Sequence, residues 1–546
     1  MPNAIYAMDP PANEPVFEYR PGSEERRRIK TQLTRFRNTE LEIPLIIGGR
    51  TVKTGNLARC IIPHDHGHRL AVFHQAGEKE VAMAIEAAAE AADSWAAMEW
   101  QDRLAIFGKA AELIAGPRRM ILNAATMLGQ GKNIHQAEID AACEMIDFLR
   151  FNAAYATQIY RQQPLSGPAE WNHLEYRPLE GFVFAVTPFN FTAISGNLPS
   201  APAMLGNTVL WKPASSAVFS AWMLMETFMQ AGLPPGVINF IPGSGAQVGN
   251  PVLVHPDLAG IHFTGSTAVF QGMWKRIADN LHHYRTYPRI VGETGGKDFI
   301  VAHVSADPDA LATALVRGAF EYQGQKCSAV SRAYLPQSLW PRLKKQLLDD
   351  LDSITVGSPE EWSHFANAVI DQTAFTRITG FIEYARSHPA AEIIAGGGYD
   401  DEIGYFIDPT VILTTDPTFK TMQEEIFGPV LTIYLYADAE FEATLDLCDR
   451  TSPYALTGAI FARDRQAVIS ASRKLVHAAG NFYINDKPTG SVVGRQPFGG
   501  GRASGTNDKA GSIINLYRWV SPRAIKENFV PATDYRYPFM QAESNH

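Results

Sequence analysis

The residues from 181 to 302 alternate short apolar runs with longer stretches of helical period, and this alternation constrains the fold more than any other feature of the chain. Strand and helix in turn at this spacing build a parallel sheet with helices on both faces. The candidate strands lie at 182–186, 208–211, 237–241, 260–263 and 299–302. Such sheets bind nucleotides at the carboxyl ends of their strands. The sequence therefore predicts an α/β chain with a Rossmann-like cofactor domain.

A second alternating region extends from about 305 to 502, with helical periods at 343–351 and 375–385. The segment 78–163 has helical period instead, since Val81, Ile85 and Ala88 recur at intervals of three and four. A chain of 546 residues has room for two or three domains. We expect packing helices in 78–163 and a second α/β domain after 302.

Composition and charge exclude several classes of protein. Hydrophobic residues make up 46% and charged residues 19%, which is typical of a globular chain with a large core. A formal net charge of −9 argues against nucleic acid or an anionic membrane as partner, because both attract clustered Lys and Arg. No apolar run approaches the roughly 18 residues of a membrane span. Residues 1–19 lack the basic start and apolar core of a signal peptide.

The four cysteines, at 60, 143, 327 and 448, contain no C-x-x-C pair, so they resemble neither a disulfide framework nor a zinc site. We expect a reducing compartment, namely the cytoplasm, or the mitochondrial matrix in a eukaryote whose presequence is unseen or removed. No metal is expected. The cluster His64, His66 and His68 with Asp65 lies between two short apolar runs and is interpreted as a polar hairpin turn.

Cys327 is the candidate nucleophile. It lies in a glycine-broken loop at 321–332, after a helix predicted to begin at Asp307-Pro308 and to end near Gly324. This placement delivers the thiol to a turn. Taken alone, an intracellular cysteine is more often a small buried hydrophobe than a nucleophile, and that alternative stands at this point.

Glu293 is the candidate base. It is flanked by glycines in Gly-Glu-Thr-Gly-Gly-Lys, 34 positions before Cys327, and an apolar strand follows. A thiolate, not a thiol, attacks a carbonyl carbon, so a nearby carboxylate could generate the nucleophile and later activate water. From spacing alone, a solvated turn tip is an equally good interpretation.

Several long motifs occur in order along nearly the whole chain, and together they carry a family resemblance. They are Thr-Pro-Phe-Asn-Phe at 187–191, Gly-Glu-Thr-Gly-Gly-Lys at 292–297, Gly-Gln-Lys-Cys-Ser at 324–328 and Glu-Glu-Ile-Phe-Gly-Pro-Val at 424–430. The chain resembles the aldehyde dehydrogenase superfamily. The segments 320–328, 480–487 and 503–509 resemble, more narrowly, the branch that oxidises glutamate semialdehyde.

The resemblance implies the aldehyde dehydrogenase fold and a division into domains. We expect an N-terminal arm at 1–45, a cofactor domain at 46–163 and 181–302, and an α/β catalytic domain at 303–505. Residues 164–180 and 506–546 resemble the small β flap through which subunits of the family associate. A homodimer or higher homo-oligomer follows.

The resemblance also implies NAD as cofactor. Its pyrophosphate is placed near Gly265 and Ser266, where a strand gives way to a helix whose free amides suit an anion. The segment 243–249 almost matches the dinucleotide motif but has one residue too many before its last glycine. The other contacts that the resemblance implies are Lys212 on the adenosine ribose, Glu425 and Phe427 around the nicotinamide ribose and ring, and Pro188. A glutamate that many relatives carry after the Lys-Pro pair is absent here, so NADP is kept as a weaker second cofactor.

The implied reaction is oxidation of an aldehyde through a thiohemiacetal and thioester on Cys327. The side-chain amide of Asn190 and the backbone N–H of Cys327 would stabilise the oxyanion, although Asn190 judged by its neighbours alone is a plain turn residue. Glu293 would activate water against the thioester, and a glutamate at this position favours a free acid over acyl transfer to coenzyme A.

The implied substrate is L-glutamate 5-semialdehyde, whose oxidation to L-glutamate is the second step of proline degradation. Ser328, Gly490 and Ser491 would hold a carboxylate by hydroxyl and backbone donors, without a buried cation. Phe191 and Phe498 would flank the aliphatic stem, although packing is the more common role of such rings. Glu144 is a carboxylate on an apolar helix face, where it is either paired structurally or near the substrate ammonium.

Three alternatives remain. The chain could oxidise another short semialdehyde, it could be a non-catalytic member of the superfamily, or it could be a thiol esterase. The intact Cys327, Glu293 and Asn190 argue against the second, and the cofactor segments argue against the third.

Overall fold

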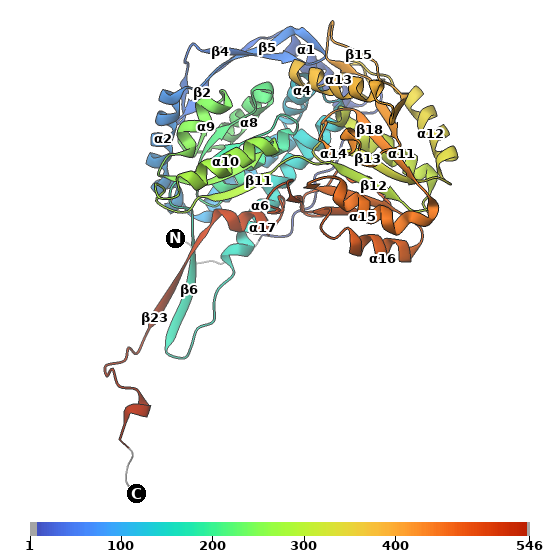
Figure 1. Cartoon of the computed structure of the whole chain (residues 1–546). Helices are drawn as coiled ribbons and strands as arrows, with labels where there is room; N and C mark the ends of the chain where they lie inside the picture. Colours follow the sequence, from blue (N-terminus) through green and yellow to red (C-terminus); the bar gives the residue numbers. More distant parts are fainter. Residues whose placement is uncertain (1–7, 543–546) are drawn as a thin grey trace.

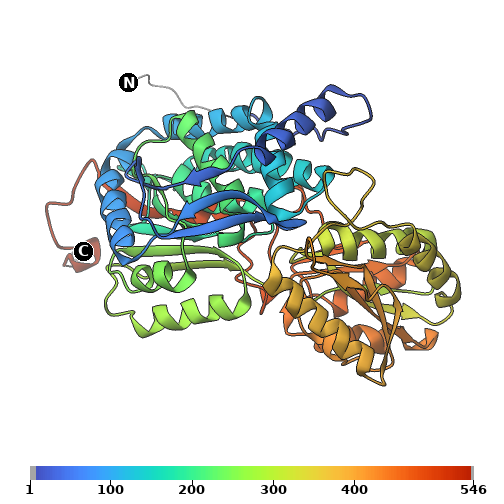
Figure 2. The same cartoon turned by 90° about the horizontal axis from the view of Figure 1, so that it is seen from above.

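The protein, described here by a computed structural model over residues 8–542, has two lobes and a narrow projecting ribbon (Figures 1 and 2). One lobe contains the elements before about residue 293 and the other contains most of those after it. Within the described residues each lobe is built on a seven-stranded sheet. The predicted α/β class is confirmed.

The first sheet has the strand order β11-β10-β7-β8-β9-β2-β3. Its strands are β2 Leu45–Ile47, β3 Arg50–Val52, β7 Phe182–Val186, β8 Thr208–Lys212, β9 Ile238–Phe240, β10 Leu258–Thr264 and β11 Arg289–Glu293. From β11 to β9 the neighbours are parallel. Four of the five predicted strands are therefore found here. Strand β11 was not predicted, and it carries Glu293 at its carboxyl end.

Helices cover this sheet, and several of them begin at its carboxyl edge. They are α2 Glu78–Ala97, α7 Thr192–Met204, α8 Val218–Ala231, α9 Gly245–Leu253 and α10 Thr267–Asp279, with the 3-10 turn η2 Ser215–Ala217 before α8. The central strands are buried on both faces, for example all five residues of β8. This is the pattern expected of a parallel sheet between two helical layers.

A further helical layer packs beside the first sheet. It contains α1 Glu24–Arg37, α3 Trp100–Ala115, α4 Arg119–Gln130, α5 Ile134–Ala137, the π-helical segment η1 Glu138–Glu144 and α6 Met145–Tyr160. The prediction of an N-terminal arm up to residue 45 was too long. Helix α1 buries Ile29, Leu33 and Phe36 against the body, and strand β1 Leu41–Ile43 pairs with β5.

The second sheet has the strand order β14-β17-β18-β13-β12-β20-β21. Its strands are β12 Asp298–Ala302, β13 Val330–Pro336, β14 Ala391–Ala395, β17 Thr410–Thr414, β18 Val430–Tyr436, β20 Thr457–Phe461 and β21 Asn481–Ile484. Its helices are α11 Pro308–Phe320, α12 Trp340–Asp352, α13 Gln372–Ser387, α14 Lys420–Gln423, α15 Phe441–Thr451 and α16 Arg465–Lys474, with the 3-10 turns η3 Glu321–Gly324 and η4 Asp438–Glu440. Short ladders join β15 Tyr399–Asp400 to β16 Phe406–Ile407 and β19 Tyr454–Ala455 to β22 Gly501–Arg502.

The predicted domain boundary after residue 302 was wrong. Strand β12 pairs in parallel with β13 and β20, so it belongs to the second sheet. Periodicity identifies a strand but does not identify its partners, which here lie far along the chain. The crossing from one sheet to the other occurs in the four residues 294–297 between β11 and β12.

The projecting ribbon consists of β6 Glu170–Arg177 paired antiparallel with β23 Ser521–Asn528, and the chain continues beyond it to the short turn η6 Pro538–Met540 (Figure 1). Residues 506–520, which were predicted to belong to the flap, do not. Helix α17 Ile513–Leu516 packs on α6, and Trp519 in the turn η5 Tyr517–Trp519 is buried. The ribbon is thus narrower than the flap that the sequence predicted.

The histidine cluster lies at a hairpin, between β4 Leu57–Ile62 and β5 Asp65–His74. His64 is buried there against Glu360, with Nε2 3.3 Å from the carboxylate. Within residues 8–542 no group of His, Cys, Asp and Glu is arranged to hold a metal ion. None of the described helices is long and apolar enough to cross a membrane.

Candidate active site

The loop that carries Cys327 is fixed by an unusual turn. Asp307 caps α11 as predicted, accepting hydrogen bonds from the amides of Asp309 and Ala310. After the helix, Tyr322, Gln323 and Gly324 all have left-handed backbone, with φ of 53°, 53° and 64°. A Cβ on Gly324 would lie 2.2 Å from the carbonyl oxygen of Gly428, so glycine is required.

Buried polar contacts hold the same turn in place. The side chain of Gln323 donates to the carbonyls of Gly131 and Ala368, at 2.9 and 2.8 Å. Non-glycine residues persist in left-handed conformation only where the surroundings enforce it, and such positions concentrate at functional sites. These contacts therefore fix the turn, and the turn fixes the position of Cys327 three residues after Gly324.

Cys327 lies where two cavities meet. It is 9% exposed and lines both a cavity of about 770 Å³ and a second of about 400 Å³. We call these the cofactor cavity and the substrate cavity. Among the described residues, Cys327 alone lines both cavities, so a molecule in either one can approach the sulfur.

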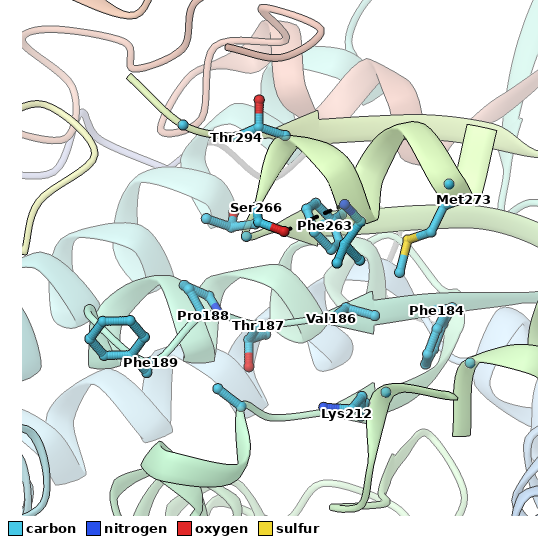
Figure 3. A pocket seen from close by; sticks show the side chains of 18 of the residues that line it. Phe184, Val186, Thr187, Pro188, Phe189, Lys212, Phe263, Ser266, Met273 and Thr294 are labelled. Atoms are coloured by element: carbon cyan, nitrogen blue, oxygen red, sulfur yellow. Dashed lines mark hydrogen bonds between the residues drawn. The ribbon is translucent and has the colours of Figure 1, made fainter. Parts of the chain in front are cut away.

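The cofactor cavity opens at the carboxyl ends of β7, β8 and β10 (Figure 3). All six predicted cofactor residues line it: Pro188, Lys212, Gly265, Ser266, Glu425 and Phe427. In Figure 3, Ser266 and Met273 lie on one side and Lys212 on the other. Four of these residues come from the first lobe and two from the second, so the cavity lies between the lobes.

Two helix N-termini border this cavity. Ser266 caps α10, with Oγ accepting from the amide of Val269 at 3.4 Å, and Ser244 caps α9 by accepting from Gln247. The first turn of each helix contributes lining residues. The segment 243–249, which the motif comparison set aside, therefore borders the same cavity as Ser266. A Cβ at Gly245, Gly249 or Gly272 would meet open space, which leaves the helix surfaces accessible to a ligand.

Two of the charged residues that line the cofactor cavity have shifted pKa values, and burial shifts the pKa of each in the direction that favours its neutral form. Burial lowers the pKa of Lys212 to about 8, and its Nζ donates to the carbonyl of Pro213 at 3.1 Å. Burial raises the pKa of Glu425, against the opposing hydrogen bond from the amide of Gly296 at 2.9 Å. Phe427 has left-handed backbone with φ of 55° and packs edge-on against Phe189.

Glu293 lies at the carboxyl end of β11 and is partly buried, and its buried Oε1 has no hydrogen-bond partner among the described residues. Burial raises the pKa of this carboxyl to about 8, and the positive charge of Lys509 opposes the shift. An unpaired buried carboxyl is costly, and such groups mark functional sites more often than they stabilise a fold. Glu293 lines a small cavity of about 40 Å³ together with Glu144 and Phe498.

Glu293 and Cys327 interact electrostatically. Burial raises the pKa of the thiol well above its ordinary value, and the negative charge of Glu293 is the next largest cause. The backbone supports this arrangement, because the segment that follows Glu293 packs on the cysteine loop: a Cβ on Gly296 would lie 2.2 Å from the carbonyl oxygen of Cys327.

Asn190 is 4% exposed and lines the cofactor cavity beside Cys327. Its Nδ2 donates to the carbonyl oxygen of Gln325 at 3.1 Å. This bond holds the side-chain amide of Asn190 against the backbone two residues before Cys327. The side chain of Gln325 in turn accepts from the amide of Ile370 at 2.9 Å. One hydrogen of the Asn190 amide remains for another acceptor.

All six predicted substrate residues line the substrate cavity: Glu144, Phe191, Ser328, Gly490, Ser491 and Phe498. Ser328 and Thr489 share a hydrogen bond of 2.8 Å between their hydroxyls, which joins the cysteine loop to residues 489–495. We call residues 489–495 the anchor loop. Glu144 ends the π-helical segment, and burial raises its pKa well above the ordinary value.

From the sequence, no cationic side chain was assigned to the substrate site. Arg317, Lys326 and Lys487 also line the substrate cavity. Lys326 is 5% exposed and paired with Glu321 at 3.1 Å, and Nζ of Lys487 donates to the carbonyl of Thr489 at 3.2 Å. Lys326 and Lys487 both lie in sequence motifs described above, so those motifs could have led to their assignment to the substrate site. The N-terminal residues Asn13, Glu14 and Val16, which also line the cavity, gave no such signal.

Comparison with known proteins identifies a family and close relatives. The family described as "Aldehyde dehydrogenase family" matches residues 52–523. "Delta-1-pyrroline-5-carboxylate dehydrogenase, mitochondrial" of Dictyostelium discoideum is 54% identical over 97% of this chain and 96% of its own, and "Delta-1-pyrroline-5-carboxylate dehydrogenase" of Agaricus bisporus is 51% identical over 98% of each. The crystal structure of the Delta-pyrroline-5-carboxylate dehydrogenase from Mycobacterium tuberculosis bound with NAD has a TM-score of 0.96 and 53% identity, covering 99% of this chain and 100% of that one.

Proposed function

The chain belongs to the aldehyde dehydrogenase family, and from this premise we propose that it is a NAD-dependent delta-1-pyrroline-5-carboxylate dehydrogenase. It oxidises L-glutamate 5-semialdehyde, the open form of 1-pyrroline-5-carboxylate, to L-glutamate, the second step of proline degradation. The observation that carries the proposal is the position of Cys327 at the junction of the cofactor and substrate cavities, with Glu293 beside it.

The residues of the cofactor cavity fit NAD. Its volume of about 770 Å³ suits a dinucleotide, and the open space at Gly245 and Gly249 leaves room beside the two capped helices. Ser266 and the first turn of α10 would bind the pyrophosphate, Lys212 the adenosine ribose and Glu425 the nicotinamide ribose. When bound, NAD accepts the hydride from the aldehyde carbon.

Cys327 begins the reaction by attacking the aldehyde carbon. The thiol has a raised pKa and must lose its proton, and Glu293 is the adjacent group that can accept it. The new sulfur–carbon bond leaves a negative oxygen, which the remaining N–H of Asn190 and the backbone N–H of Cys327 would bind. Loss of the hydride converts this thiohemiacetal into a thioester on Cys327.

Glu293 completes the reaction by removing a proton from water. The resulting nucleophile attacks the thioester carbon, the carbon–sulfur bond breaks, and the carboxylic acid and the thiol form. This step requires a free carboxylate, so Glu293 must first release to solvent the proton that it took from Cys327. The enclosed position of Glu293 keeps its pKa near neutrality, which is where a general base works best.

The substrate cavity suits a substrate that carries an α-carboxylate and an α-ammonium at the end opposite its aldehyde. The anchor loop and Lys487 lie at one part of its wall, where they would hold the α-carboxylate. Glu144 lies at another part, where an ionised carboxylate would attract the α-ammonium. Phe191 and Phe498 would contact the methylene groups between them.

Initial rates with a panel of aldehydes test the proposal. We expect the highest kcat/KM for glutamate semialdehyde with NAD, a lower value with NADP, and loss of turnover by roughly a thousandfold or more in Cys327→Ala. A higher kcat/KM for succinic semialdehyde would overturn the substrate assignment. Ester cleavage without dependence on a nucleotide would overturn the dehydrogenase assignment itself.

Assembly and location are further parts of the proposal. A two-stranded ribbon is marginal by itself in water, so a homodimer or larger homo-oligomer that covers β6 and β23 is supported. The four cysteines are free and buried, which suits a reducing compartment. The name of the Dictyostelium relative supports the mitochondrial matrix if this chain comes from a eukaryote, and cell fractionation would decide this.

A further inference from the structure

The N-terminal segment, residues 9–19, forms part of the wall of the substrate cavity. It has neither helix nor strand, yet Asn13, Glu14 and Val16 line the cavity with residues of α6 and of the anchor loop. No sequence motif pointed to it. Its contacts show why it lies there.

Asn13 joins the two sides of the cavity. Its Nδ2 donates to Oδ2 of Asp147 on α6 and to the carbonyl of Val493 in the anchor loop, both at 2.8 Å. Its Oδ1 accepts from Nε of Arg495 at 2.9 Å. Both N–H groups and the carbonyl of one amide are thus used, and two of the three bonds hold the anchor loop.

The backbone around Asn13 is itself held by buried charges. The amide of Glu14 donates to Oδ1 of Asp147 at 2.8 Å, and the Glu14 carboxylate accepts from Arg119 at 2.6 Å and from Arg150 at 2.7 Å. Arg119 is 1% exposed and also donates to the carbonyl of Pro15 at 2.8 Å. Asn13 is therefore presented to the anchor loop from a fixed support.

A second group of contacts secures the far end of the segment. The amide of Phe17 and the hydroxyl of Tyr19 donate to the two oxygens of Glu138, at 2.9 and 2.7 Å. The Phe17 ring lies 3.8 Å from the Arg119 guanidinium carbon. Glu138 is completely buried in the π-helical segment that ends at Glu144, so the segment and the substrate cavity share one support.

We propose that Asn13 is a positioning residue for substrate specificity, which holds the anchor loop in the geometry that binds the α-carboxylate of the substrate. The proposal rests on the proposed function. The carboxylate is remote from the reacting carbon, so its contacts bind substrate and transition state alike. Their loss raises KM and changes kcat little.

The experiment compares Asn13→Ala with the wild type. We expect KM for glutamate semialdehyde to rise about tenfold, with kcat within about twofold and KM for NAD unchanged. For propanal, which has no carboxylate, we expect both constants to stay within about twofold. Glu18→Gln is the matched control, because Glu18 is on the same segment but exposed and paired only with Arg20. It should behave as the wild type.

Arg495→Gln breaks the same contact from the loop side and keeps the test decisive if Asn13→Ala folds poorly. Arg495 is exposed, so its replacement should not disturb the core. If the two residues act through one contact, the double variant has the KM of the worse single variant, whereas independent roles would multiply the two effects. Multiplied effects would overturn the proposal.

Hydrogen exchange separates this inference from the proposed function. If the wild-type enzyme does not oxidise glutamate semialdehyde, the proposed function fails, and faster amide exchange at 489–495 in Asn13→Ala would still support the positioning role. Unchanged exchange in the anchor loop, or a KM within twofold of the wild type, would overturn it. An equal rise in KM for propanal would also overturn it, because the effect would then not concern the carboxylate.

Discussion

Two buried acids with raised pKa values determine how the reacting sulfur can be activated. Burial raises the pKa of both Cys327 and Glu293, and the negative charge of Glu293 further raises the pKa of the thiol. The resting pair therefore holds its protons at neutral pH. Activity must depend on removing one of them, and Glu293, with a pKa of about 8, is the group that titrates in the accessible range.

This dependence gives a prediction for the pH profile. Below pH 8 Glu293 is mainly protonated and cannot accept a proton, and above pH 8 it is mainly ionised. We expect kcat to rise between pH 7 and pH 9 with an apparent pKa near 8. In Glu293→Gln the rise should vanish and thioester formation should slow, and the thioester that still forms should persist because its hydrolysis also lacks the base, which acid quenching and mass spectrometry would detect. A wild-type profile that is flat from pH 6 to pH 9 would contradict the assignment.

Asn190 gives a second prediction at this scale. Asn190→Ala removes a side-chain donor from the oxyanion and should lower kcat about a hundredfold or more, with a small change in KM for NAD. Asn190→Asp is a stricter comparison, because it keeps the shape but replaces the donor by an acceptor. Steady-state kinetics checks both, and an Asn190→Ala enzyme with kcat within threefold of the wild type would show that the backbone N–H of Cys327 suffices.

At the scale of elements, the turn before Cys327 is the part most sensitive to sequence. Gly324→Ala places a Cβ 2.2 Å from the carbonyl oxygen of Gly428 and strains a residue with φ of 64°. We expect a loss of roughly 1–3 kcal/mol in the free energy of unfolding and a larger proportional loss of kcat, because the thiol moves. Thermal unfolding and initial rates measure the two effects.

The control for that substitution is Gly380→Ala. Gly380 lies in α13 with ordinary helical backbone, and a Cβ there meets nothing within 4 Å. This change should stabilise the protein by roughly 0.5–1 kcal/mol, since alanine loses less entropy than glycine on entering a helix. If both substitutions had the same effect, the turn would not be the cause.

Local signals predicted some of these elements and could not predict others. Asp307-Pro308 marked the start of α11 and Ser266 the start of α10, because capping depends on neighbours within three residues. The partners of β12 could not be predicted, since its register with β13 and β20 is decided by pairing across long stretches of chain. The π-helical segment before Glu144 was also missed, because its apolar spacing resembles that of an α-helix.

The residues of the candidate site also divide into those that local sequence patterns predicted and those that they did not. Motif resemblance located Cys327, Glu293 and the cofactor residues, which stand in continuous sequence patterns. It did not locate Asn13 or the buried role of Lys326, because each acquires its environment only when distant segments meet. The cations of the substrate cavity were missed for the same reason. A lysine beside the nucleophile is easily taken for a surface residue when its partner, Glu321, is not seen.

At the scale of the whole molecule, the ribbon of β6 and β23 predicts self-association. Its eight-residue strands pair only with each other within the described chain, and large side chains such as Trp171 and Phe529 are exposed on or beside it. We expect the wild type to sediment at twice the mass of the chain or more. Ile525→Pro, in the middle of β23, should shift the protein to smaller species by removing a backbone donor and distorting the strand.

The matched control for the ribbon is Glu527→Gln, an exposed residue of the same strand whose backbone can still pair. It should leave the sedimentation unchanged. Retained turnover in the Ile525→Pro protein would show that the site is complete in one chain, as the lining of both cavities by a single chain suggests. A wild-type protein that sediments as a single chain would contradict the prediction.

The bond between Asn13 and Arg495 joins residues 482 positions apart and has a consequence for biosynthesis. Ribosomes add about 5–20 residues per second, so the beginning of the chain waits roughly 25–100 s for its last partner to be translated. During that interval the side chain of Asn13 lacks two of its three hydrogen-bond partners, Val493 and Arg495. Newly synthesised chains should therefore be accessible to proteases and chaperones at residues 9–19 until translation is almost finished. Enzymatic activity should appear only after that point, in one late step.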